Sequence, residues 1–198
     1  PENRLYWRMN RRRLEAEAIR DAILAVGGSL DLTMGGTQLP TENRKYVTST
    51  ANVNPVVYEG TRRSIYQPVV RSALYELFQA FDFADPSVSG GKRETTTIAP
   101  QALFMMNSKL VAEQTRALAE LLLNDESLDD SGRVERVFEL CYSRPASPDE
   151  IDRTLHYIER YIEADADRHA EDGDSAPLKA WQSFCRAIIA SNEFVNVE

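Results

Sequence analysis

Two carboxylates near the middle of the chain have the spacing of an acid-base pair. Asp82 and Asp85 lie three residues apart, bounded by phenylalanines and a proline. A pair of this kind could act as acid and base in the cleavage of a glycosidic bond. An aspartate-rich segment at the end of a helix is the commoner explanation of the same pair.

The stretch DPSVSGGKRETTTIAPQ, which begins at Asp85, resembles half of a phosphate-binding loop. That motif requires a glycine five residues before the second glycine and a serine or threonine directly after the lysine. Pro86 and Arg93 occupy those positions, which excludes a nucleotide-binding loop of this type. An anion could still bind beside Arg93 and Thr96, near the start of the following helix. The alternative is a glycine turn before a threonine-capped helix, with Arg93 paired to Asp82 or Asp85.

Metal and nucleophile motifs are incomplete in this chain. The run from Asp165 resembles the start of a calcium loop, but alanines occupy its required glycine and glutamate positions. His156 and Glu159 form a single pair at helical spacing, and no G-x-S-x-G motif occurs. We therefore predict no metal site and assign no catalytic residue.

The two cysteines, Cys141 and Cys185, lack the C-x-x-C spacing of zinc knuckles and of covalent haem attachment. Both fall on the apolar faces of predicted helices, which favours buried thiols over a disulfide, although the pairing stays open. We expect no cofactor in this chain.

Composition indicates a folded chain with one sizeable core. Its 198 residues are 42% hydrophobic, so we predict a single domain over 1–198. No run of about 18 apolar residues occurs, so we expect no membrane span. The sequence begins with Pro1 and not Met. We therefore expect a piece of a longer protein.

Charge is distributed unevenly along the chain. The net charge is −8, yet residues 1–75 carry +4 and residues 76–198 carry −12. The basic first part could contact an acidic surface, and its stretch RLYWRMNRRR combines arginine with aromatic residues. The whole chain is too acidic to favour nucleic acid as a partner.

Helical periodicity dominates the sequence, so we predict a mainly α fold: an antiparallel helical bundle with a long irregular loop and at most a short extended segment. We expect Trp7 to lie in the core, and the first helix to bury Leu14, Ala18, Ala22 and Val26. The predicted helices span 4–26, 71–80, 100–123 with a break at Asn107–Ser108, 133–142, 148–168 and 177–193; the last four form a four-helix core over 100–194, residues 37–60 form a variable loop, and 62–70 is extended.

The predicted helix at 148–168 has a clear start. Ser147 can cap it, Pro148 occupies its first turn, and Glu150 can return a hydrogen bond to the cap.

Four phrases in this order carry a family resemblance: RRRLEAEAIRDAILAVGGSLDLTMGG, RRSIYQPVVRSALYELFQAFDFADPSVSGGKRETTTIAPQALFMMNS, FELCYSRPASPDE and AIIASNEFVNVE. They are similar to planctomycete secreted domain one, a C-terminal domain of unknown function. The similarity covers nearly the whole chain, and the second phrase is its most specific part.

The resemblance implies a setting more than a mechanism. It implies a secreted, periplasmic or cell-surface protein whose upstream domains often include a c-type cytochrome, so that any haem would belong to an upstream domain. A role near extracellular polysaccharide breakdown or redox chemistry is supposed for the family.

We therefore expect a non-catalytic interaction or scaffold module that contacts upstream domains of the same polypeptide, with an anionic glycan as a further ligand. The alternative is part of an extracellular enzyme acting on anionic polysaccharide, with a cleft lined by residues 62–107. The candidate ligand-binding residues are Arg62, Arg63, Asp82, Asp85, Arg93, Thr96, Gln101 and Asn107. A scaffold should bury the first five as internal pairs, whereas an enzyme should expose several of them together in one pocket.

Overall fold

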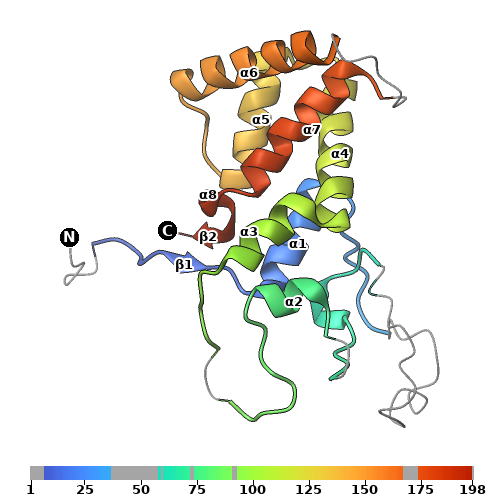
Figure 1. Cartoon of the computed structure of the whole chain (residues 1–198), viewed down its shortest axis with the longest axis vertical. Coiled ribbons are helices and arrows are strands. Elements are labelled where there is room, and N and C mark those ends of the chain that lie inside the picture. Colours follow the sequence, from blue (N-terminus) through green and yellow to red (C-terminus); the bar gives the residue numbers. More distant parts are fainter. Residues whose placement is uncertain are drawn as a thin grey trace.

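Within its described residues, the chain folds into helices and one two-stranded ribbon. The structure is a computed structural model that describes residues 7–36, 58, 60–71, 74–90, 93–166 and 174–197 (Figure 1). The fold is mainly α, as predicted. Its elements are β1 (Arg12–Arg13), α1 (Ala16–Val26), a single 3-10 turn η1 (Ser64–Tyr66), α2 (Glu76–Ala80), α3 (Ala99–Asn107), α4 (Lys109–Asn124), α5 (Asp130–Tyr142), α6 (Pro148–Ala166), α7 (Ala176–Ile189), α8 (Asn192–Val195) and β2 (Asn196–Val197).

Helices α4, α5, α6 and α7 surround one apolar cluster. The apolar positions predicted for α5 and α7 are buried in it, including Val134, Phe138 and Trp181. Helix α6 lies across the ends of α5 and α7 in Figure 1 and contributes Ile158 to the same cluster. Burial of these side chains is the main force that holds the four helices together.

A second apolar cluster lies between α1, α2, α3 and α8. Ile19 and Ile23 of α1 pack with Phe78 of α2 and Met105 of α3. Tyr142, at the end of α5, packs against both clusters. The two clusters therefore meet at the end of α5.

The N-terminal segment forms a strand instead of the helix predicted over 4–26. Arg12 pairs with Val197 and Arg13 with Asn196 in an antiparallel ribbon, and α1 begins only at Ala16. Trp7 is 71% exposed, so its predicted place in the core is wrong.

The face predicted to be buried in the first helix is confirmed in part, because Leu14 and Ala22 are partly buried against the second apolar cluster. Val26 is buried as expected, but Ala18 is exposed. The buried positions of α1 are Ala16, Ile19, Arg20, Ile23, Leu24 and Val26.

Serine side chains cap the starts of four helices, α4, α6, α7 and α8. The predicted break at Asn107–Ser108 is present, and Ser108 caps α4 by accepting a hydrogen bond from the Val111 N–H at 3.3 Å. Ser147 and Glu150 form the predicted capping box, in which the Glu150 carboxylate accepts from the Ser147 N–H at 2.8 Å. Ser191 divides the predicted last helix into α7 and α8.

The segment predicted to be extended over 62–70 contains the turn η1 instead. Only Arg62 makes a strand-like contact, a parallel bridge to Asp31. Most of the loop predicted over 37–60 lies outside the described residues.

Candidate functional site

The loop over 82–98 joins α2 to α3 and carries most of the candidate residues. It begins at Asp82, whose φ of 56° lies in the left-handed region. Aspartate tolerates this region better than most residues do. The Asp82 carboxylate accepts from the Thr96 N–H at 2.8 Å and from the Thr96 hydroxyl at 2.9 Å. These contacts close the two ends of the loop onto each other.

Arg13 of β1 joins the same contact from outside the loop. Its Nη2 donates to the Asp82 carboxylate at 2.6 Å and to the Phe81 carbonyl at 3.4 Å, and its Nη1 donates to the Thr96 carbonyl. The guanidinium also lies 5.8 Å from the centre of the Phe81 ring. Arg13 therefore connects the N-terminal strand to both ends of the loop.

Gln101 connects the start of α3 to Thr96. Its amide nitrogen donates to the Thr96 carbonyl at 3.1 Å, and its amide oxygen accepts from the Ile98 N–H at 3.4 Å. The cap of α3 is Ile98, so the predicted threonine cap is replaced by Gln101 reaching back from inside the helix.

Arg93 pairs with Glu17 of α1. The glycine-turn alternative is therefore wrong in pairing Arg93 with Asp82 or Asp85. The two terminal nitrogens of Arg93 donate to the two Glu17 oxygens at 2.6 and 2.7 Å. Glu15 lies 3.1 Å from the same guanidinium. The guanidinium also lies 5.1 Å from the centre of the Phe83 ring, which stacks on Phe78. This bidentate pair anchors the middle of the loop to α1.

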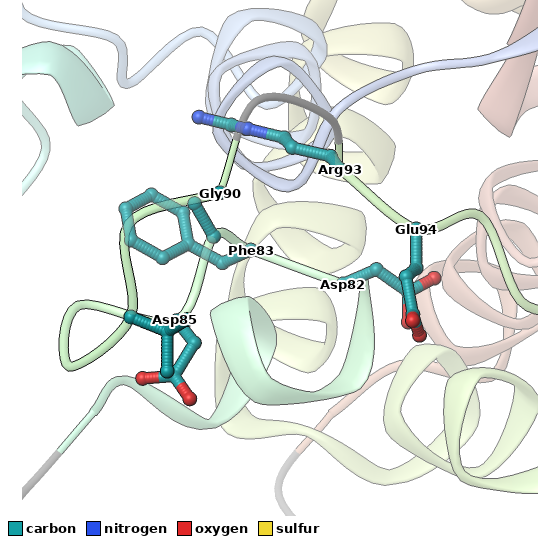
Figure 2. Close-up of a pocket in the computed structure, with 8 residues that line it drawn as sticks. Asp82, Phe83, Asp85, Gly90, Arg93 and Glu94 are labelled. Atoms are coloured by element: carbon teal, nitrogen blue, oxygen red, sulfur yellow. The ribbon is translucent and has the colours of Figure 1, made fainter.

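A surface pocket of about 570 Å³ lies beside these contacts (Figure 2). Its lining includes Asp82, Phe83, Asp85, Arg93 and Glu94. The Asp82 and Asp85 side chains point in different directions in Figure 2. Both carboxylates therefore line the pocket, but their side chains do not converge on a common position.

The pKa values of Asp82 and Asp85 are shifted downward. Burial raises the pKa of Asp82, but hydrogen bonds from Thr96 and Arg13 outweigh it and hold that pKa below its usual value. A hydrogen bond from the Ser87 hydroxyl, together with one from the Ser87 N–H, lowers the pKa of Asp85. A general acid in glycoside hydrolysis needs a raised pKa. Both groups are instead held as carboxylates.

Asp82, Asp85 and Arg93 line this pocket, Thr96 and Gln101 belong to the contacts around Asp82, and the other three predicted site residues lie away from both. Arg62 donates from Nη2 to the carbonyls of Thr33, at 2.8 Å, and Gly35, and its guanidinium stacks 4.4 Å from the Tyr66 ring centre. Arg63 lies in a separate groove beside β1, and Asn107 is an exposed residue at the end of α3. The structure brings together Asp82, Asp85, Arg93, Thr96 and Gln101.

Sequence reasoning missed three residues that organise this region: Arg13, Glu17 and Arg20. Arg20 is 1% exposed and donates from Nη1 to the Arg62 carbonyl at 2.8 Å and the Ser64 hydroxyl at 3.2 Å. Its spacing could have revealed it, because Arg20 stands four residues after buried Ala16 and three before Ile23, on the core face of α1.

Both cysteines are free, as favoured from their positions. Cys185 is buried and Cys141 is half-buried, and burial raises the pKa of each thiol, that of Cys141 to about 12. Among the described residues, no group of three His, Cys, Asp or Glu side chains is placed to hold a metal ion. No helix in the described ranges is long and apolar enough to cross a membrane.

Comparison with protein-family models identifies the family of the chain. The model of PSD1, described as a protein of unknown function (DUF1553), matches residues 1–158. The chain belongs to the PSD1 family. This confirms the family resemblance, and the first three of the four phrases lie within the matched residues. No curated protein and no solved structure gives a significant match to the chain.

The PSD1 match ends within α6, while the packing continues beyond it. Helix α7 packs against α4 and α6, and β2 pairs with β1. Residues beyond the matched range therefore complete both the bundle and the terminal ribbon of this PSD1 chain.

A second arginine with several partners lies in the segment CYSRPASPDE, within the PSD1 match. Arg144 binds Glu150 at 2.9 and 3.0 Å and Glu193 of α8 at 2.6 and 3.0 Å. Its guanidinium also lies 5.1 Å from the Phe138 ring centre. Arg144 thereby joins the turn between α5 and α6 to the C-terminal helix.

Proposed function

We propose that this chain is a non-catalytic interaction module of an exported multidomain protein. The observation that carries the proposal is the engagement of the charged loop residues with one another. Asp82 accepts hydrogen bonds from Arg13 and Thr96, and Arg93 is held by Glu17. These side chains shape a loop and attach it to α1 and β1.

The acid-base properties of the pocket support the same proposal. An acid-base pair needs one carboxyl that carries a proton near neutral pH. Both Asp82 and Asp85 have lowered pKa values, so neither can supply that proton. Asp82 also has its oxygens occupied by three donors, which leaves them poorly placed to accept a substrate proton.

Export and the partners are inferred from the family resemblance. The upstream domains of the same polypeptide are the first partners that we propose, and any haem belongs to one of them. The basic N-terminal part of the chain supports contact with acidic surfaces, whereas the overall negative charge disfavours nucleic acid.

A second candidate function is part of an extracellular enzyme acting on anionic polysaccharide. The pocket of about 570 Å³ favours it, because two aspartates, Glu94 and Arg93 share its lining. In this role Arg93 would hold a sugar carboxylate or sulfate, although it would have to leave Glu17.

The two functions are separated by assaying the chain on alginate, pectate, hyaluronan and heparan sulfate. Released reducing ends and unsaturated sugars are measured for the wild type and for Asp82→Asn and Asp85→Asn. The interaction module should release no more than a heat-denatured blank. Turnover by the wild type that disappears in a folded Asp82→Asn or Asp85→Asn variant would establish the enzyme instead.

A further inference from the structure

We propose that a groove beside the terminal ribbon binds an extended acidic peptide segment of a partner protein. The groove has a volume of about 510 Å³ and lies between β1, β2, the start of α1 and the turn η1. We call it the arginine groove, after Arg12 and Arg63 in its lining. The inference rests on the proposed interaction function and names the chemistry of the partner.

Arg12 and Arg63 are the two arginines of the arginine groove that have no partner among the described residues. Neither side chain forms a hydrogen bond or an ion pair with any residue in the part of the chain that the structure describes. Both are exposed. The third arginine of the lining, Arg13, is neutralised by Asp82 at 2.6 Å.

The acidic residues of the groove already have partners. Glu15 and Glu17 contact Arg93 at 3.1 and 2.6 Å. Asp21 accepts from the Ser64 N–H at 2.7 Å and lies 3.7 Å from Arg20. Glu15 and Glu17 share one arginine, so the groove and these partners hold five arginines against four carboxylates, and Arg12 and Arg63 are the two guanidinium groups placed to bind carboxylates in bidentate geometry.

Each wall of the groove also carries an exposed aliphatic side chain. Ile65 of η1 is 74% exposed and Val197 of β2 is 42% exposed. Val197 lies directly opposite Arg12 in the ribbon register, so the two side chains share one face. Each wall thus pairs one arginine with one aliphatic group, which suits a ligand that combines carboxylates with apolar side chains.

These features favour a peptide over a continuous polyanion. A sulfated glycan, a nucleic acid or a lipid headgroup layer would bring negative charge close to Glu15, Glu17 and Asp21, which line the same groove. A peptide can place separate carboxylates on the two arginines and cover Ile65 and Val197 with aliphatic side chains.

The test measures fluorescence anisotropy of a fluorescein-labelled peptide, Gly-Glu-Leu-Glu-Val-Gly amide, with the full chain at low salt. The Arg12→Gln/Arg63→Gln double variant should bind at least about 10-fold more weakly, because two charge-assisted contacts are lost. The control variant Arg153→Gln/Arg160→Gln removes the same charge from the remote helix α6 and should bind as the wild type does. Circular dichroism of each variant confirms folding.

A second ligand keeps the test independent of the variants. The same peptide with glutamine in place of both glutamates should bind at least about 10-fold more weakly to the wild type. The proposal is overturned if the double variant binds as tightly as the wild type, if the α6 control loses equal affinity, or if a heparin tetrasaccharide binds more tightly than the peptide. Those results would not contradict the proposed interaction function of the chain. Polysaccharide turnover would contradict it.

Discussion

Arg13 and Asp82, 69 positions apart in the chain, are joined by a hydrogen bond of 2.6 Å. Because Arg13 lies in β1, which pairs with β2, this contact joins the N-terminal segment, the C-terminal segment and the loop after α2. Thr96 and Gln101 extend the same network to the start of α3. The loop over 82–98 is thus held by contacts that are distant in sequence.

Replacing Asp82 should destabilise the fold. We expect Asp82→Ala to lower the free energy of unfolding by about 2–3 kcal/mol, because Arg13 and the Thr96 N–H lose a charged acceptor. Asp85→Ala is the matched control, since Asp85 bonds only within an exposed turn, and it should leave the same free energy nearly unchanged. Urea unfolding measures both. Equal effects of the two substitutions would show that the Asp82 network adds no stability.

The pair between Arg93 and Glu17 should show a measurable coupling energy. A double-mutant cycle with Arg93→Ala and Glu17→Ala should give about 1 kcal/mol, because the pair is bidentate and partly buried. The same cycle on Arg153 and Asp149, an exposed pair 3.6 Å apart on α6, should give less than about 0.5 kcal/mol. A coupling at Arg93 no larger than that of the α6 pair would contradict the anchoring role.

The thiols of Cys141 and Cys185 should be unreactive in the folded chain. Burial raises both pKa values, so little of the reactive thiolate is present near pH 8. We expect Ellman's reagent to react at least about 100-fold more slowly with the native chain than with the chain in guanidinium chloride. Reductant should leave the melting temperature unchanged. A lower melting temperature in dithiothreitol would reveal a disulfide.

Acid should weaken the fold through its paired carboxylates. The Arg144 hydrogen bond lowers the pKa of Glu150 to about 2, and the pKa values of Glu17 and Asp82 are also lowered. A lowered folded-state pKa contributes stability that is complete above the unfolded value and is lost as the pH falls through the folded value. The urea midpoint should therefore hold above about pH 4.5 and decline from there toward pH 2.

Glu150→Gln provides the control for this pH dependence. The difference in stability between the wild type and Glu150→Gln should shrink as the pH falls below about 4.5, because protonation removes the same charge from Glu150. A difference that stays constant between pH 7 and pH 3 would show that the ion pair with Arg144 contributes nothing to it.

Local pattern was enough to predict most of the helical elements. The apolar spacing of Val134, Val137 and Phe138 predicted a helix that is buried on that face, and Ser147 with Glu150 marked the start of the next one. Helix starts and buried faces of this kind depend on residues within a few positions of each other.

The contacts of the candidate site could not be predicted in this way. The sequence pattern predicted a helix at Arg12 and Arg13. They form a strand because they pair with Val197 and Asn196, at the far end of the chain. The partner of Arg93 is Glu17, 76 positions away, although Asp82 and Asp85 are nearer in sequence. Such pairs depend on how the helices pack, which local periodicity does not contain.

Hydrogen exchange at the Thr96 amide tests most directly whether the loop over 82–98 is held in place, because this N–H donates to Asp82 at 2.8 Å. If the loop is held as a structural element, the Thr96 N–H should exchange at least about 100-fold more slowly than an unstructured amide, and Arg13→Ala should remove most of that protection in a chain that stays folded. Exchange of the wild-type Thr96 amide at the rate of an unstructured amide would show that the Asp82 contacts do not hold the loop.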